Sequence, residues 1–179
     1  MIKNKIDVVT LGCSKNLVDS ELLMRQLIAN GYTVAHDPEE ARGEIAIINT
    51  CGFIGDAKEE SINMILTFAE AKRRNKLKKL YVMGCLPERY RQELTDEIPE
   101  VDKFYGKFDW KNLIADLGKS YYKELAYDRS LSTPSHYAYV KISEGCNRTC
   151  SYCSIPLITG KYKSRPMEEI EEEIRHLVA

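Results

Sequence analysis

The chain has 179 residues, of which 44% are hydrophobic and 30% are charged, with 10 glycines and 6 prolines. These values are close to the averages of globular proteins and exclude the collagen-like, fibrous and disordered classes. The formal net charge of -1 gives no general electrostatic reason to bind nucleic acid, because phosphate neutralisation needs an excess of clustered Lys and Arg. No apolar run reaches the roughly 18 residues of a membrane span, and the N-terminus lacks a signal-peptide core, which predicts a cytoplasmic protein without a membrane partner.

Apolar runs alternate with helical patterns over the first two thirds of the sequence. Strands separated by helices pair in parallel through right-handed crossovers, so we expect residues 1–118 to form an α/β domain with a doubly wound parallel sheet. The apolar runs predict four strands, at 6–12, 44–50, 79–84 and 101–106. The predicted helices run from Leu17 to Gly31, from a capping box formed by Asp56 and Glu59, near 86–95 and near 109–118.

The pattern starts again after a predicted linker at 119–136. YAYVKIS (137–143) predicts a strand, a cysteine-rich loop follows it, and RPMEEIEEEIRHLVA (165–179) predicts a helix. One β-loop-α unit is the first unit of a β/α barrel, and a complete barrel needs more than about 200 residues. We therefore expect 137–179 to be the truncated start of a second domain, and the chain to be an N-terminal fragment that is inactive alone.

Three cysteines, which we call the first triple, each follow a predicted strand and each have a glycine neighbour: Cys13, Cys51 and Cys85. The carboxyl ends of parallel strands meet at one edge of a sheet, where open α/β folds bind ligands, so we expect the three thiols to share one crevice. An all-thiolate set of three suits an iron–sulfur cluster better than zinc. The alternative is that these are ordinary core cysteines, because free Cys is often buried.

The other three cysteines, which we call the second triple, form the motif C-x3-C-x2-C: Cys146, Cys150 and Cys153. Three thiolates leave one iron of a four-iron cluster able to take an outside ligand, such as the amine and carboxylate of a substrate. A zinc knuckle stays an alternative, although zinc modules usually carry paired C-x2-C units. Tyr152 precedes the last cysteine, and on sequence alone a packing aromatic is one of two open interpretations of it, the other being a role at the site.

The second triple with its aromatic residue resembles the radical S-adenosylmethionine superfamily. Four stretches narrow the resemblance: LGCSKNLVDSE (11–21), NTCGFIGDAKEES (50–61), MGCLPERY (83–90) and YVKISEGCNRTCSYCSIPLITGKYKSRP (139–166). They look like the methylthiotransferases of this superfamily, and in particular like the branch that modifies a ribosomal protein. GCSKN and NTCGFI favour that branch over the sister branch that methylthiolates transfer RNA.

The resemblance implies two [4Fe-4S] clusters and S-adenosyl-L-methionine as cofactors. The first triple would hold an auxiliary cluster, the second triple would hold the cluster that generates a 5′-deoxyadenosyl radical, and Tyr152 would lie beside the adenine. The implied reaction replaces a C–H by C–S–CH3 at the β-carbon of an aspartate in small ribosomal subunit protein twelve. One cofactor molecule would supply the methyl group and another the radical, with an electron donor such as flavodoxin. We expect a monomer, and no catalytic residue beyond the cluster ligands is predicted.

Two further interpretations of the sequence stay open. A transfer-RNA methylthiotransferase would share both clusters and differ only in its substrate. A non-catalytic interaction module would use the same thiols to hold structural zinc, and its α/β domain would bind a partner protein.

Overall fold

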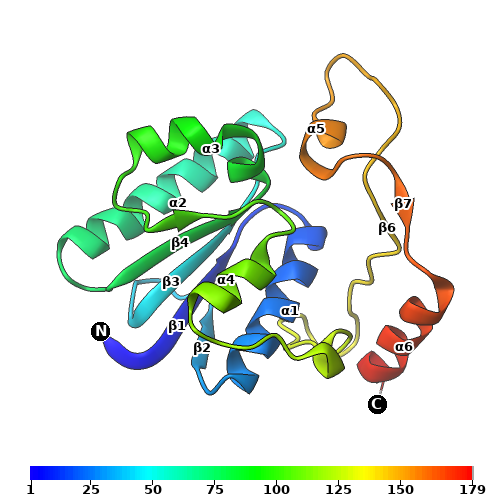
Figure 1. The fold of residues 1–179 in the computed structure, drawn as a ribbon, viewed down its shortest axis with the longest axis horizontal. Coiled ribbons are helices and arrows are strands. Elements are labelled where there is room, and N and C mark those ends of the chain that lie inside the picture. The colour runs from blue at the N-terminus through cyan, green and yellow to red at the C-terminus, as the bar shows by residue number, and fades with distance from the viewer. Residues whose placement is uncertain (179) are drawn as a thin grey trace.

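Five parallel strands form the centre of the structure, a computed structural model that describes residues 1–178 (Figure 1). Their order along the sheet is β2-β1-β3-β4-β5, and the strands are β1 (Ile2–Thr10), β2 (Thr33–His36), β3 (Gly43–Thr50), β4 (Lys79–Gly84) and β5 (Lys103–Phe104). The chain leaves β1 toward β2 on one side and returns to β3 on the other. The point where the order reverses therefore lies between β1 and β3, and in open α/β sheets this is where ligands bind.

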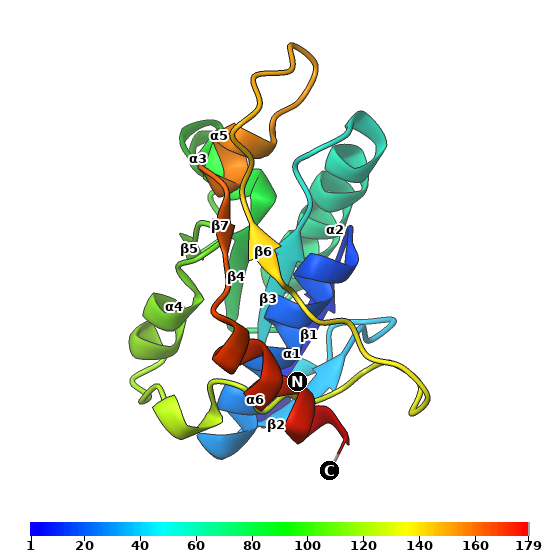
Figure 2. The same cartoon turned by 90° about the vertical axis from the view of Figure 1, so that its right-hand side faces the viewer.

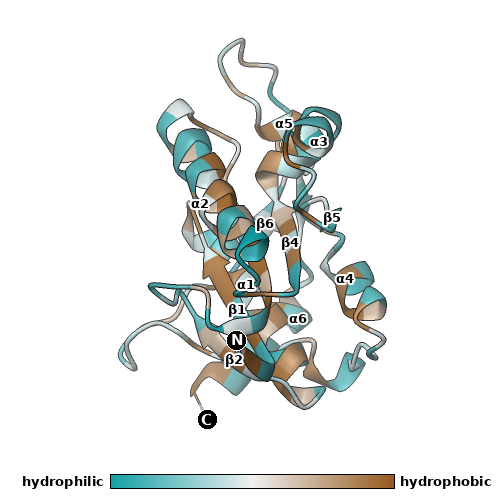
Figure 3. Ribbon diagram, turned by 90° about the vertical axis from the view of Figure 1, so that its left-hand side faces the viewer, coloured by the Kyte–Doolittle hydropathy of each residue, from teal (hydrophilic) through white to brown (hydrophobic). Residues whose placement is uncertain are grey.

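Four helices cover the two faces of the sheet, which confirms the doubly wound α/β prediction. They are α1 (Ser14–Ala29), α2 (Gly55–Arg73), α3 (Cys85–Glu97) and α4 (Trp110–Asp116). Side chains alternate between the faces along a strand, so Ile47 packs with α1 and α4 whereas Ile48 packs with α2 and α3. Figure 3 shows the resulting arrangement, with hydrophobic strands at the centre flanked by helices of mixed hydropathy.

Long buried strands occur where the apolar runs predicted them, but two local predictions were wrong. The edge strand β2 was missed, because its four residues are half-buried or exposed and carry no apolar run. The capping box of Asp56 and Glu59 does not form: α2 is preceded by Ile54 and no side chain caps it. Asp56 instead lies in the first turn, where a carboxylate is favoured by the helix dipole.

The chain after the sheet differs from the strand predicted at 137–143. Residues 137–142 have no regular structure, and only Ser143–Glu144 (β6) form a strand. This strand pairs antiparallel with β7 (Lys163–Ser164), and the helices of this part are α5 (Ile155–Thr159) and α6 (Met167–Val178), after a 3-10 turn at Lys123–Leu125. A strand needs a neighbouring strand to form hydrogen bonds with its backbone N–H and C=O groups. Here the short antiparallel strand β7 is that neighbour. The predicted barrel unit is therefore not confirmed.

The segment after the linker packs against the first part of the chain rather than standing apart. Helix α5 lies beside α3, and Figure 2 shows α6 on the same side of the sheet as α1, in front of it in this view. A buried ion-pair cluster joins the two parts, with the guanidinium of Arg129 3.7 Å from Glu21 of α1 and 3.4 Å from Glu173 of α6. Arg165 pairs with the same Glu173. The domain boundaries proposed from the sequence, 1–118, 119–136 and 137–179, stay predictions.

Candidate metal centre

The first triple lies at the carboxyl-terminal edge of the sheet, beside the point where the strand order reverses. Cys13 precedes the first residue of α1, Cys51 follows β3 directly, and Cys85 follows β4 and begins α3. These are three neighbouring strands of the same sheet. The sequence prediction of equivalent strand-end positions is therefore matched by the topology.

The three cysteine loops pack closely against one another. A Cβ atom added to Gly12 would lie 2.6 Å from the Cβ and 3.0 Å from the Sγ of Cys51. Gly12 also has a φ of +94°, a backbone conformation that favours glycine. A Cβ atom on Gly52 would lie 2.8 Å from the carbonyl oxygen of Cys85. Glycine at these two positions lets the loops of the first triple approach each other.

Buried polar side chains hold these loops in place, and the sequence analysis did not predict them as site residues. The Asn16 side-chain amide donates to the carbonyl oxygens of Leu11 at 2.9 Å and Thr50 at 3.0 Å, which ties the loop after β1 to the end of β3. The hydroxyl of Ser61, on α2, accepts the backbone N–H of Cys51 at 3.0 Å. Asn16 falls in the GCSKN motif, which is the sequence signal that could have identified it.

Replacing Ser61 by alanine should destabilise the loop that carries Cys51. The variant leaves the buried N–H of Cys51 without a partner, which costs about 1–3 kcal/mol of unfolding free energy. Thr67→Ala is a matched control, because Thr67 also lies on α2 and donates to the carbonyl four residues earlier, but is exposed. Its expected cost is within about 0.5 kcal/mol. Equal urea midpoints for the two variants would contradict this role of Ser61.

Burial dominates the electrostatics of the Cys85 thiol. Burial raises the pKa of Cys85, Lys107 lowers it and Cys51 and Cys13 raise it, and together these influences bring the pKa to about 11. The mutual influence of the three thiols reflects their proximity, since each thiolate disfavours the next. Without a metal the Cys85 side chain is therefore a neutral thiol at neutral pH, and metal binding would have to release its proton.

Lys107 lies beside the first triple and was not predicted from the sequence. Its side chain is 3% exposed, and its Nζ atom is 3.4 Å from Asn16 Oδ1, 3.5 Å from Asp19 Oδ2 and 4.0 Å from Cys85 Sγ. Burial acts to lower the pKa of Lys107, but the neighbouring anionic groups, led by Asp19, outweigh it and raise the pKa above its ordinary value. Lys107 is therefore a buried cation next to a thiol.

The second triple lies on the loop between β6 and α5. Cys150 is exposed, whereas Cys146 and Cys153 are half-buried. The backbone N–H of Cys153 donates to the Cys150 carbonyl at 3.1 Å, and the N–H of Cys146 donates to the Gly160 carbonyl at 3.0 Å. Tyr152 is 89% exposed, so among the described residues it does not act as a packing aromatic.

The donor chemistry of both triples fits an iron–sulfur cluster better than a single metal ion. All six cysteines are free thiols, and the described residues contain no group of three or more His, Cys, Asp or Glu side chains arranged to hold a metal ion. Soft thiolates are the ligands that such clusters take in proteins.

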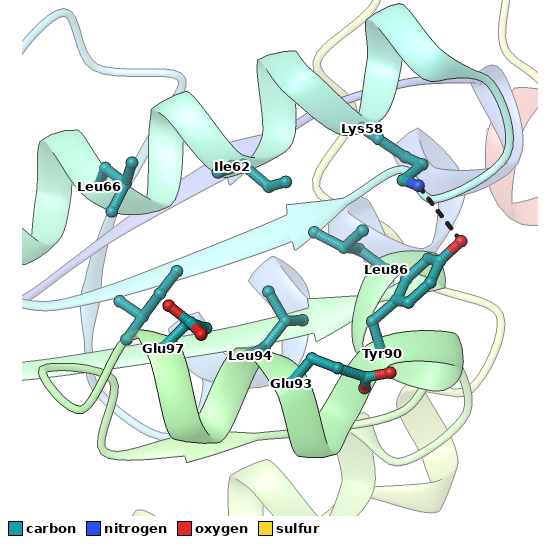
Figure 4. A pocket seen from close by; sticks show the side chains of 9 residues that line it. Lys58, Ile62, Leu66, Leu86, Tyr90, Glu93, Leu94 and Glu97 are labelled. Atoms are coloured by element: carbon teal, nitrogen blue, oxygen red, sulfur yellow. Dashed lines mark hydrogen bonds between the residues drawn. The ribbon is translucent and has the colours of Figure 1, made fainter.

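An apolar groove of about 400 Å³ between α2 and α3 is separate from the thiols (Figure 4). Ile62, Leu86 and Leu94 line it, and at one end Lys58 donates to the Tyr90 hydroxyl at 3.2 Å. None of the described residues that line it is a cysteine. The groove therefore offers no soft metal ligand, and the strand-end edge is the candidate site.

Two protein-family profiles match different parts of the chain, and each part contains one of the two cysteine triples. A profile of the uncharacterized protein family UPF0004 matches residues 5–106, which is more than half of the chain and includes the first triple. The chain belongs to the UPF0004 family. In this UPF0004 chain, a profile of the Radical SAM superfamily also matches residues 140–179, which include the second triple. The resemblance to radical S-adenosylmethionine proteins is confirmed.

Curated relatives of this UPF0004 protein cover its sequence from end to end. A protein of Parabacteroides distasonis is 70% identical over all 179 residues, and one of Bacteroides thetaiotaomicron is 68% identical over the same length. A protein of Flavobacterium johnsoniae is 51% identical over 176 residues, or 98% of the chain. Each is named "Ribosomal protein uS12 methylthiotransferase RimO". The chain spans 41% of the length of the first two relatives and 40% of the third.

Among residues 1–178, no helix combines the length and the apolar character needed to cross a lipid bilayer.

Proposed function

We propose that this protein is a radical S-adenosylmethionine methylthiotransferase that adds a methylthio group to the β-carbon of an aspartate in ribosomal protein uS12. The observation that carries the proposal is the placement of the first triple at the ends of three neighbouring parallel strands, in loops that pack together. The printed names of the relatives support the reaction and the substrate. No relative described above is named for transfer RNA, so the transfer-RNA alternative is not favoured.

The proposal assigns one [4Fe-4S] cluster to each triple. The first triple would hold the auxiliary cluster, the second triple would hold the cluster with an open iron, and exposed Tyr152 would lie beside the adenine of S-adenosyl-L-methionine. When bound, these groups would supply the radical chemistry that removes an unactivated hydrogen, together with the methyl group and the site of sulfur handling. Acid–base groups of the chain alone cannot remove the hydrogen from such a C–H bond, because it is too weakly acidic.

The residues of the chain would position and shield these groups. Asn16 and Ser61 fix the loops of the first triple through buried hydrogen bonds. Cys51 and Cys85 are each only 8% exposed, which keeps water and oxidants from two of the three ligands. The loop of the second triple is more open, with Cys150 exposed, which leaves room for a cofactor to approach its iron.

The proposal includes an electron donor such as flavodoxin, a cytoplasmic location and a monomeric protein. Within it, residues 1–118 are the methylthiotransferase-type α/β domain, 119–136 the linker and 137–179 the start of the radical domain. The balanced charge of the chain gives no support for a nucleic-acid partner.

A chimera tests the function. This chain replaces the matching 179 residues of the Parabacteroides distasonis relative, in cells of that organism that lack their own copy. We expect mass spectrometry of ribosomal protein uS12 to show one methylthio group on an aspartate. The chimera with Cys150→Ala should leave uS12 unmodified, because it removes a proposed ligand of the open-iron cluster. A chimera that loads iron normally yet modifies transfer RNA, or neither substrate, contradicts the proposal.

A further inference from the structure

Lys107 occupies the same kind of position after β5 that cysteines occupy after β1 and β4. Gly12 and Cys13 follow β1, Gly84 and Cys85 come at the end of β4, and Gly106 and Lys107 follow β5. The four strand ends β1, β3, β4 and β5 are neighbours in the sheet. Three of them therefore present a thiol at the carboxyl-terminal edge, and the fourth presents an ammonium group.

Lys107 is the only buried lysine among residues 1–178. A lysine side chain is almost never fully buried unless it has charged partners, because removing its charge from water is costly. The partners are on the chain: Asp19 Oδ2 at 3.5 Å, Glu144 Oε1 at 4.0 Å and Cys85 Sγ at 4.0 Å. The side chain is thus held in one place, beside a proposed cluster ligand.

The two carboxylates near Lys107 are more tightly held by another lysine. Lys141 Nζ lies 2.7 Å from Asp19 Oδ1 and 2.7 Å from Glu144 Oε1, and Lys15 adds a contact of 3.3 Å to Glu144. Lys15 is 46% exposed and water screens its charge, so the two more buried lysines, Lys107 and Lys141, match the two carboxylates in number. Lys107 has the longer carboxylate contacts of the two and lies next to the thiol, so its charge is the less neutralised and faces the first triple.

We propose that Lys107 is a positioning residue whose fixed positive charge stabilises the negative charge of the first triple and raises the reduction potential of the cluster bound there. The inference rests on the proposed function, because it requires a cluster on Cys13, Cys51 and Cys85. Reduction adds a negative charge to the cluster, and a buried cation 4.0 Å from a ligand sulfur favours that charge much more than a solvated cation does. Net charge and hydrogen bonds to sulfur are among the properties that set cluster potentials.

The contacts of these lysines also link the first triple to the segment that precedes the second triple. Glu144, which Lys107 and Lys141 share, lies in β6, two residues before Cys146. Lys15, two residues after Cys13, also donates to the Ser143 carbonyl at 3.1 Å. The lysines thus fix the start of the second cysteine loop against the first triple.

The test measures the midpoint potential of the cluster on the first triple alone. The full 179-residue chain carrying Cys146→Ala, Cys150→Ala and Cys153→Ala serves as the parent, and it is reconstituted anaerobically with iron and sulfide. We expect Lys107→Met to lower the equilibrium constant for one-electron reduction at least about tenfold, which is a shift of about 59 mV to more negative potential. Lys107→Arg keeps the charge and should restore the parental potential.

Lys103→Met is the matched control, because Lys103 lies in β5, is 53% exposed and pairs with Asp116 on the surface. Its potential should equal that of the parent. A Lys107→Met protein with parental iron content and an unshifted potential overturns the inference.

Loss of the cluster in Lys107→Met and in Lys107→Gln, but not in Lys107→Arg, also supports the role, because of these variants only Lys107→Arg keeps the positive charge. Loss in all three overturns it, since shape rather than charge would then be required. A parent that binds no iron contradicts the proposed function itself, and this result is obtained before any lysine variant is measured.

Discussion

Replacing Cys13, Cys51 and Cys85 together by alanine should lower the iron content of the anaerobically reconstituted chain from about eight atoms to about four, because each [4Fe-4S] cluster contains four. The three thiols lie at the ends of three neighbouring strands and are the proposed ligands of one cluster. Iron and acid-labile sulfide, measured per polypeptide, should fall together. The brown colour should persist, since the second triple is intact.

The matched control removes the second triple instead, with Cys146→Ala, Cys150→Ala and Cys153→Ala. It should also lose about half of the iron, because the two triples are separate in the fold: one lies at the sheet edge and the other on the loop before α5. Stoichiometric zinc without charge-transfer absorption would contradict the cluster assignment and favour the zinc-module alternative. Complete loss of iron from either variant would contradict two independent centres.

Arg129→Met should destabilise the chain by about 3 kcal/mol or more, because breaking a buried ion pair leaves uncompensated charge in the interior. The Arg129 side chain has no exposed surface and lies between Glu21 and Glu173, whose side chains are 2% and 4% exposed. Removing the cation leaves these two carboxylates near each other. We expect the free energy of unfolding in urea to fall, and limited proteolysis to cut faster within the linker at 119–136.

Arg25→Met is the matched control for this cluster. Arg25 lies on α1 and pairs with Asp128 at 2.6 Å, but the two side chains are 32% and 33% exposed. Water screens this pair, so its loss should cost no more than about 1 kcal/mol. Equal losses of unfolding free energy in the two arginine variants would contradict the proposed effect of burying Arg129. Adding Glu21→Gln to Arg129→Met should recover part of the stability, because Glu21 is then no longer a buried charge without its cation, whereas Glu173 keeps Arg165.

The central sheet and the first triple could be predicted from the sequence because their signals are local. The runs at 44–50 and 79–84 are apolar at consecutive positions, as expected for strands buried on both faces, and they became β3 and β4. Strands and helices alternated, which favoured parallel pairing, and parallel pairing places every strand end of one sense at one edge. The shared edge of Cys13, Cys51 and Cys85 follows from this.

The second part of the chain was harder to predict. YAYVKIS (137–143) has the composition of a strand, yet only Ser143 of it is in β6. Strand formation depends on a partner strand, and the partner found here, Lys163–Ser164, lies about twenty positions later and pairs antiparallel. Nothing within the seven residues specifies that partner. Composition alone therefore overestimated the strand.

By itself, the sequence determined the α/β class, the strand-end cysteines and the C-x3-C-x2-C motif, because periodicity and spacing depend on neighbouring residues. Only the tertiary structure decided that Lys107 is buried beside Cys85 and that Arg129 joins α1 to α6. The partners of Lys107 on α1, Asp19 and Asn16, are 88 and 91 positions away in the chain. A charged side chain is exposed by default, and it becomes stable in the interior only where folding brings opposite charges from distant segments to meet it.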